Sequence, residues 1–158
     1  MNWEEVCADP VLQDLPYKIE LNEWGQIVMT PASNKHGLFQ SEIIKRLGNL
    51  IKSGRTVSEC SINTGKGTKV SDVAWFSAAF FKKHGTETPY SSAPEICIEI
   101  LSPSNSPEEM QEKRDLYFAA GAKEVWICGE DGNICFYNQD RQLAHSQIVS
   151  KFPAKIDL

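Results

Sequence analysis

Alternation of apolar and polar residues predicts strands in two parts of the N-terminal half. The stretch "YKIELNEWGQIVMT" (residues 17–30) reads as two short strands, with a turn across residues 23–26 in which Gly25 supplies the bend. "RTVSECSIN" and "TKVSDVAWFS" (55–63 and 68–77) read as two further strands joined by the turn "TGKGT". Two hairpins are therefore expected before residue 78.

A different period, with apolar residues every three or four positions, predicts two main helices. The first covers "SNKHGLFQSEIIKRLGNLIKSG" (33–54), with Ser33 or Asn34 as its cap and Gly54 as its end. The second begins after Ser106, where a capping box is possible, and runs to about residue 120 before Gly121. Both are expected to pack on a sheet.

The remaining segments complete the predicted fold. "AAFFKKHG" (78–85) reads as a short helix, "PEICIEIL" (94–101) as a strand, and "KEVWICG" and "NICFYN" (123–129 and 133–138) as strands around a turn, with a last strand in "LAHSQIVS" (143–150). Strands on both sides of a helix between residues 95 and 128 favour an α/β or α+β sheet with helices packed on it. We expect one domain over residues 1–158.

Composition narrows the function classes. The chain has 158 residues, of which 41% are hydrophobic and 23% charged, and its net charge is −5. An acidic protein lacks the clustered Lys and Arg of a strong non-specific nucleic-acid binder, so any contact with DNA or RNA must be local or metal-assisted. No apolar run approaches the ~18 residues of a membrane span, and "MNWEEVCADP" lacks a signal peptide's features, so a cytoplasmic protein is expected.

Cysteine and motif patterns exclude several kinds of site. Five widely spaced cysteines, without a CxxC pair, favour reduced and mostly buried thiols over a zinc site or a disulfide framework. Neither a Gly-x-Ser-x-Gly elbow nor a His-Glu-x-x-His pair occurs, and this argues against a serine hydrolase and a zinc protease.

Two acids interrupt predicted strands. Glu99 in "PEICIEILSP" has apolar neighbours on both sides, and an ionised carboxylate there is costly unless a cation, a metal or several donors meet it. Asp72 lies in the mostly apolar "KVSDVAWF". Carboxylates on neighbouring strands can hold a magnesium ion. The alternative is an edge strand with a solvated Glu99 and an Asp72 that only caps or turns.

Helical phase makes Lys113 a third candidate. Met110, Lys113, Tyr117 and Ala120 share one stripe, which is the face expected to pack on the sheet. A lysine there either snorkels to water or meets a carboxylate, and an ammonium near two acids and a metal would offset charge on an attacked phosphate.

Other polar residues are open to both functional and structural interpretations. Glu20 in the first hairpin is a solvated strand residue or part of a metal site, and Glu42 in the first helix fits the surface equally well. His36 lies in the first turn of that helix, where a histidine is more often a structural or surface residue than a catalytic base.

The succession "SDVAW", "PEICIEILSPSNS" and "EKRDLYFAAGAKEVWIC" resembles the Uma family of restriction endonucleases, within the PD-(D/E)XK nuclease superfamily. The likeness takes in the opening hairpin, the "TPAS…H" approach to the first helix and the closing strands, so it covers nearly all of the chain from about Tyr17. It implies a restriction-endonuclease-like mixed central sheet flanked by helices, with an N-terminal β-hairpin.

The resemblance also implies a site. Asp72 matches the aspartate of the "PD" element and Glu99 the second acid, both as ligands of Mg²⁺ or of Mn²⁺ in its place. Leu101 stands where the motif's lysine is usual, and the family places that lysine on the next helix, at Lys113. Glu20 looks like the family's early hairpin acid. Ser71 replaces the proline of "PD", which supplies no ligand.

Three hypotheses follow. The first is a magnesium-dependent endonuclease acting on nucleic acid, with DNA as the expected partner and a homodimer as the simplest way to cut both strands. The second is a nuclease-fold binding or regulatory module without catalysis, since fold does not fix function. The third, a two-carboxylate glycosidase, leaves the buried-face lysine unexplained.

Overall fold

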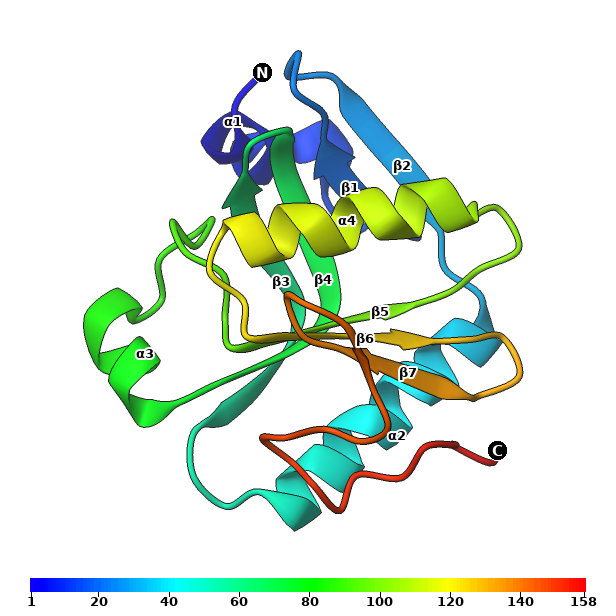
Figure 1. Ribbon diagram of the computed structural model, residues 1–158. Coiled ribbons are helices and arrows are strands. Elements are labelled where there is room, and N and C mark those ends of the chain that lie inside the picture. The colour runs from blue at the N-terminus through cyan, green and yellow to red at the C-terminus, as the bar shows by residue number, and fades with distance from the viewer.

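The computed structural model describes residues 1–158 and contains four α-helices and eight strands (Figure 1). The helices are α1 (Trp3–Ala8), α2 (Asn34–Leu50), α3 (Ala78–His84) and α4 (Pro107–Ala119), and a short 3-10 helix covers Pro10–Leu12. The strands are β1 (Tyr17–Leu21), β2 (Ile27–Pro31), β3 (Arg55–Thr64), β4 (Gly67–Phe76), β5 (Ile96–Ile100), β6 (Glu124–Cys128), β7 (Ile134–Tyr137) and β8 (Gln142–Leu143).

The strands form two sheets. β1 and β2 make a separate antiparallel hairpin, and the other six strands make one sheet in the order β3-β4-β5-β6-β7-β8. Its neighbours are antiparallel except for β5 and β6, which are parallel and are connected by α4. The predicted mixed sheet, its flanking helices and the N-terminal hairpin are confirmed.

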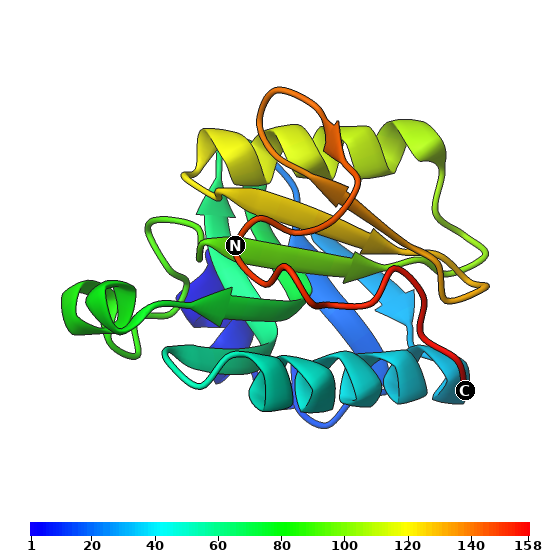
Figure 2. The same cartoon turned by 60° about the horizontal axis from the view of Figure 1, so that its bottom comes forward.

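Each face of the central sheet is covered by one long helix. Figure 2 shows α4 above the strands and α2 below them. In β5, alternate residues point to opposite faces, so that Ile96 and Ile98 pack in the cluster that contains the α2 side chains, whereas Cys97 packs in the cluster beneath α4. Glu99 shares the face of Cys97 and therefore points toward α4.

α2 starts as predicted but ends differently. The Ser33 hydroxyl accepts a hydrogen bond from the amide of His36 (3.1 Å), and Phe39, Ile43 and Leu47 are buried. The helix ends at Leu50, so Gly54 does not cap it. Gly54 instead has a positive φ of 71° at the entry to β3, where a Cβ would lie 2.3 Å from a backbone oxygen of β4.

α4 follows its predicted boundaries closely. Ser106 caps it by accepting from the amide of Glu109 (3.1 Å), and Pro107 occupies the first helical position. The predicted stripe faces the sheet, since Met110, Lys113 and Tyr117 are all buried. The strand that alternation predicted for Glu99 is also central rather than an edge strand, so the solvated interpretation of Glu99 is wrong.

The predicted last strand over residues 143–150 is wrong. Only Gln142–Leu143 pairs with β7, and the following segment instead wraps around a buried carboxylate, Glu124. Helix α1 is a further element that the periodicity did not predict.

The N-terminal hairpin docks on β4 rather than joining the central sheet. Gly67, at the start of β4, has φ +84°, and a Cβ there would lie 2.4 Å from the carbonyl oxygens of Leu21 and Asn22. The Glu20 carboxylate accepts a hydrogen bond from the amide of Val70 (2.7 Å). The hairpin thus brings its own polar side chains to the edge of β4.

No helix combines the length and apolar character that crossing a bilayer requires.

Candidate active site

The site begins where β4 and β5 separate. These strands pair from Trp75↔Ile96 to Val73↔Ile98, and the next pair in the same register would be Asp72 and Glu99. The strands are joined there by side chains instead of backbone. Asp72 accepts a hydrogen bond from the amide of Ile100 at Oδ2 (2.8 Å). The opening leaves two buried carboxylates side by side, with Glu99 in contact with α4 and Asp72 in contact with α2.

Ser71, which stands where the family resemblance places a proline, helps to form this opening. Its hydroxyl accepts from the amide of Ile98 (3.0 Å) and donates to the carbonyl of Val73 (2.7 Å). The side chain is completely buried. A proline ring could not make either hydrogen bond, so at this position the serine supplies the link between the two strands.

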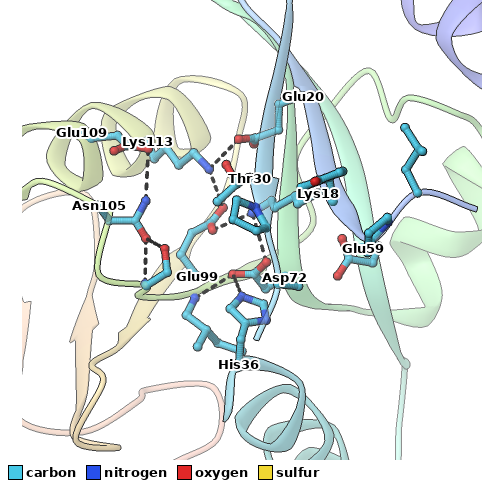
Figure 3. Close-up of a pocket in the computed structure, with 17 residues that line it drawn as sticks. Lys18, Glu20, Thr30, His36, Glu59, Asp72, Glu99, Asn105, Glu109 and Lys113 are labelled. Carbon is cyan, nitrogen blue, oxygen red and sulfur yellow. Dashed lines mark hydrogen bonds and ion pairs between the residues drawn. The ribbon is translucent and has the colours of Figure 1, made fainter. Parts of the chain in front are cut away.

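Both carboxylates converge on one cation, the ammonium of Lys18. Its Nζ lies 3.0 Å from Oδ1 of Asp72 and 3.0 Å from Oε2 of Glu99. Lys18 comes from β1, so the hairpin carries this charge across to the central sheet (Figure 3). Asp72 and Glu99 are 1% and 2% exposed, and an ionised carboxylate at such depth requires a partner of this kind.

A second ammonium approaches from α4. Nζ of Lys113 donates to Oε1 of Glu20 (2.9 Å) and lies 3.5 Å from Oε1 of Glu99. The hydroxyl of Tyr117, one turn further along α4, donates to the same Glu99 oxygen (2.6 Å). The structure therefore places the four predicted site residues, Glu20, Asp72, Glu99 and Lys113, in one cluster.

Two residues of α2 complete the surroundings of Asp72. Nε2 of His36 lies 3.3 Å from Oδ2 of Asp72. Gln40 donates to the backbone carbonyl of Asp72 and to the side chain of Glu59, both at 2.7 Å. Glu59 has φ +53°, and the β3–β4 ladder lacks a pair between Glu59 and Asp72. The Gln40 amide thus takes up the Asp72 carbonyl at an interruption of the ladder.

Charge in the cluster is not balanced. Three carboxylates, those of Glu20, Asp72 and Glu99, face the two ammonium groups of Lys18 and Lys113. Burial raises the pKa of Glu99 to about 7; Lys113 and Lys18 oppose that rise, and Asp72 and Glu20 add to it. Glu99 is therefore the carboxyl group of the cluster that most readily takes up a proton.

Asp72, Glu20 and His36 shift toward their charged forms. Burial acts to raise the pKa of Asp72, but the Lys18 charge and the His36 hydrogen bond outweigh it and hold that pKa below its usual range. The hydrogen bond to Asp72 raises the pKa of His36. Burial likewise acts to raise the pKa of Glu20, and Lys18 and Lys113 lower it overall. Asp72 and Glu20 are therefore anionic at neutral pH.

These groups line one cleft that opens to solvent between the hairpin, α2 and α4. Lys18, Glu20 and Thr30 line it from the hairpin, His36 from α2, Asp72 and Glu99 from its floor, and Asn105, Glu109 and Lys113 from the start of α4 and the loop before it. A ligand entering this cleft would meet both carboxylates and both lysines.

The donor set fits a hard divalent cation. Oxygens of Asp72 and Glu99 already converge on one positive charge, the Lys18 ammonium, and carboxylate oxygens are the ligands that Mg²⁺ prefers. No group of three or more His, Cys, Asp and Glu side chains is arranged to hold a metal ion. Mg²⁺ commonly uses one or two carboxylates and completes its shell with water and substrate phosphate, so two acids meet its ordinary requirement.

Sequence reasoning missed Lys18 and Gln40, and it favoured a structural or surface place for His36. Strand alternation does put Lys18 on the same hairpin face as Glu20, and that was the one available signal. Three other residues stay outside the cluster. Glu42 pairs with Arg46 on the surface of α2, His84 lies against Phe80 on α3, and the His145 ring lies 3.1 Å from the backbone carbonyl of Ser146.

All five cysteines are free. Cys60, Cys97 and Cys128 are buried, in agreement with the expectation of small buried hydrophobes, whereas Cys7 is exposed and Cys135 is partly exposed.

A crystal structure with a similar fold comes from Anabaena variabilis and is described as "a putative nuclease belonging to DUF820". The two chains are 19% identical, with a TM-score of 0.75, and the similarity covers 98% of this chain and 94% of the other. At this identity the comparison establishes the fold. No protein with a curated description matches the chain.

The family comparison extends over residues 4–156, which match the Uma2 family model, described as "Putative restriction endonuclease". This agrees with the resemblance carried by the strands of Asp72 and Glu99 and by α4. The chain belongs to the Uma2 family of restriction-endonuclease-like proteins.

Proposed function

We propose that this protein is a magnesium-dependent endonuclease that hydrolyses phosphodiester bonds in DNA. One observation carries the proposal: two buried carboxylates on neighbouring strands, Asp72 and Glu99, converge on a single positive charge at the floor of an open cleft. The Uma2 family and the nuclease-like fold support the reaction class.

The residues of the cluster have distinct roles in this reaction. Asp72 and Glu99 would hold the Mg²⁺ ion, which supplies a water of lowered pKa and offsets charge on the phosphate. Lys113 is held 2.9 Å from Glu20, so its ammonium is fixed beside Glu99 and offsets charge that develops on the phosphate oxygens. Tyr117 holds one oxygen of Glu99 and leaves the other directed into the cleft.

His36 and Gln40 act on Asp72 rather than on the substrate. His36 restrains one carboxylate oxygen and Gln40 the backbone carbonyl, so the side chain is fixed from two directions. A cleft that holds ligands in place before the substrate arrives loses less free energy in ordering them.

The acidic net charge of −5 fits this assignment only if the local charge changes on metal binding. Three carboxyl groups face two lysines and His36, whose pKa is raised by Asp72, and a divalent cation would add two positive charges to this cluster. Phosphodiester binding would then depend on the metal. The proposal includes a homodimer, because two symmetry-related sites cut both strands of a duplex most simply.

Supercoiled plasmid incubated with Mg²⁺ or Mn²⁺ tests the proposal directly. We expect metal-dependent nicking that a chelator abolishes and that Asp72→Ala removes. Calorimetry should show that Asp72→Ala also loses Mn²⁺ binding while its circular dichroism spectrum is retained. Unchanged Mn²⁺ binding in this variant would contradict the site, and absence of nicking on DNA and RNA substrates would favour a binding module without catalysis.

A further inference from the structure

Lys18 differs from the other lysine of the cluster in what would remain beside it after a metal ion binds. Its two acceptors, Oδ1 of Asp72 and Oε2 of Glu99, both lie at 3.0 Å and belong to the two proposed ligands. The stronger contact of Lys113, at 2.9 Å, is instead with Glu20. A cation held by Asp72 and Glu99 would therefore take both hydrogen-bond acceptors of Lys18, whereas Lys113 would keep its main acceptor, Glu20.

The ammonium and a metal ion cannot share these two oxygens. Ligand oxygens lie about 2.0–2.1 Å from Mg²⁺, which is closer than the ammonium hydrogen bonds, so both cations would need the same space. Like charges at such a separation repel strongly where water is scarce, and the Lys18 side chain is only 11% exposed.

We propose that the Lys18 ammonium competes with the divalent cation for the oxygens of Asp72 and Glu99. When the metal binds, the ammonium leaves these two carboxylates and contacts the phosphodiester of the substrate. This inference rests on the proposed function and assigns a further substrate-binding residue to the same site.

The second half of the proposal follows from the position of β1. Lys18 lines the open cleft with Thr30 of the adjoining strand and Glu59 of β3. The other carboxylates near Lys18 already have partners, since Glu20 accepts from Lys113 and the Val70 amide and Glu59 accepts from Gln40. A partly buried ammonium displaced from Asp72 and Glu99 therefore needs another anion, because leaving it unpaired is costly. The anion that enters this cleft during the reaction is the phosphate. Metal and substrate binding are thus coupled, because the metal displaces the Lys18 ammonium from its carboxylates and the phosphate gives that ammonium a new partner.

Titration calorimetry with Mn²⁺ alone tests the competition without relying on activity. Lys18→Met should bind Mn²⁺ at least tenfold more tightly than the natural protein, whereas Lys18→Arg, which keeps the charge, should not bind it more tightly. Lys66→Met is the matched control, because Lys66 pairs with Glu112 on the exposed surface and its loss changes the net charge equally. Its Mn²⁺ affinity should stay within twofold of the natural value.

Thermal unfolding gives a second readout that also covers a weakened variant. Removal of Lys18 leaves two buried carboxylates with fewer donors, so Lys18→Met should melt lower without metal. Mn²⁺ should then raise its melting temperature by more than it raises that of the natural protein, because tighter binding stabilises the folded state more. An equal or smaller increase would contradict the competition.

Plasmid nicking separates the two parts of the role. Lys18→Met should reach half of its maximal rate at a lower Mn²⁺ concentration, but that maximal rate should fall at least tenfold because a phosphate contact is lost. An unchanged maximal rate would show that Lys18 does not act on the substrate.

The outcomes also separate this inference from the proposed function. If the natural protein and Lys18→Met bind Mn²⁺ with equal affinity while Asp72→Ala does not bind it, the competition is overturned and the metal site is supported. Failure of both folded proteins to bind Mn²⁺ would overturn the metal site and the competition with it.

Discussion

Two buried glutamates on adjacent strands of this sheet show how the same residue type serves different ends. Glu124, at the start of β6, is 1% exposed and accepts only from neutral donors. These are the indole of Trp126 (2.7 Å), the hydroxyl of Ser146 (2.7 Å) and the amides of Gln147 (2.7 Å) and Ile148 (3.2 Å). Glu99, near the end of β5, is 2% exposed but lies between two lysines and beside a second carboxylate.

The difference lies in the partners and in access. Four neutral donors enclose Glu124 and hold the segment after β8 against the sheet. Both carboxylate oxygens of Glu124 are therefore satisfied by hydrogen bonds within the fold. Glu99 lines a cleft, faces two ammonium groups and has a pKa raised to about 7, mainly by burial. A buried acid is therefore a candidate functional group when its partners are exchangeable and reachable from solvent, and a structural group when they are neither.

The largest loss of stability is expected from Glu124→Ala. It leaves the Trp126 indole, the Ser146 hydroxyl and the Gln147 amide without their acceptor, while the Ile148 amide keeps the Ser146 oxygen (3.2 Å), and this should lower the free energy of unfolding by about 3 kcal/mol. Glu124→Gln keeps one carbonyl oxygen and should lose about half as much. Urea unfolding measures both values. A loss below about 1 kcal/mol for the alanine variant would contradict the structural role.

Lys113→Met should have a smaller effect on stability and a large one on cleavage. Glu20 keeps the Val70 amide and Glu99 keeps Lys18 and Tyr117, so the loss should be about 2 kcal/mol, less than for a buried ion pair broken completely. Loss of a charge held beside the phosphate should lower the nicking rate roughly a hundredfold. Nicking at the natural rate would remove Lys113 from the mechanism.

Tyr117→Phe sharpens the comparison, because it removes one donor to Glu99 and keeps the buried ring. We expect a loss of about 1.5 kcal/mol in urea unfolding, the value between an ordinary hydrogen bond and one to a fully charged group. Mn²⁺ affinity should fall severalfold because the Glu99 carboxylate is less firmly oriented. A variant with natural stability and natural Mn²⁺ affinity would show that the 2.6 Å contact contributes to neither.

The smallest effect on stability is expected from Glu99→Gln. Burial raises the pKa of Glu99, with Asp72 and Glu20 adding to the rise, so a neutral amide at this depth avoids the cost of burying a third carboxylate. The free energy of unfolding should change by less than about 0.5 kcal/mol at neutral pH, whereas Mn²⁺ binding should be lost. A loss as large as that of Glu124→Gln would show that the two buried acids play the same role.

Local patterns predicted the parts of the fold that local physics determines. Caps at Ser33 and Ser106, the hairpin turn at Gly25 and the buried stripe through Lys113 all follow from neighbours within one or two turns of chain. For that reason helical phase alone placed Lys113 on the sheet-facing side of α4, where the structure shows it.

Features that depend on distant contacts were not accessible in the same way. Lys18 and Glu99 are 81 positions apart, and nothing near Lys18 indicates that the hairpin docks on β4 instead of joining the sheet. The segment around Ser146 was predicted as a strand, but the Ser146 hydroxyl and the amides after it bind Glu124. Tertiary hydrogen bonds there outweighed strand propensity.

The separate hairpin has a consequence for when the site comes into being. Lys113 and Glu20 are 93 positions apart, so their ion pair joins the first sheet to the last long helix. A ribosome must release α4 before the cluster can close, and contacts of such high sequence separation form late in folding. A growing or partly unfolded chain carries the same acids and lysines with no assembled cleft, so any hydrolytic activity is confined to the finished molecule.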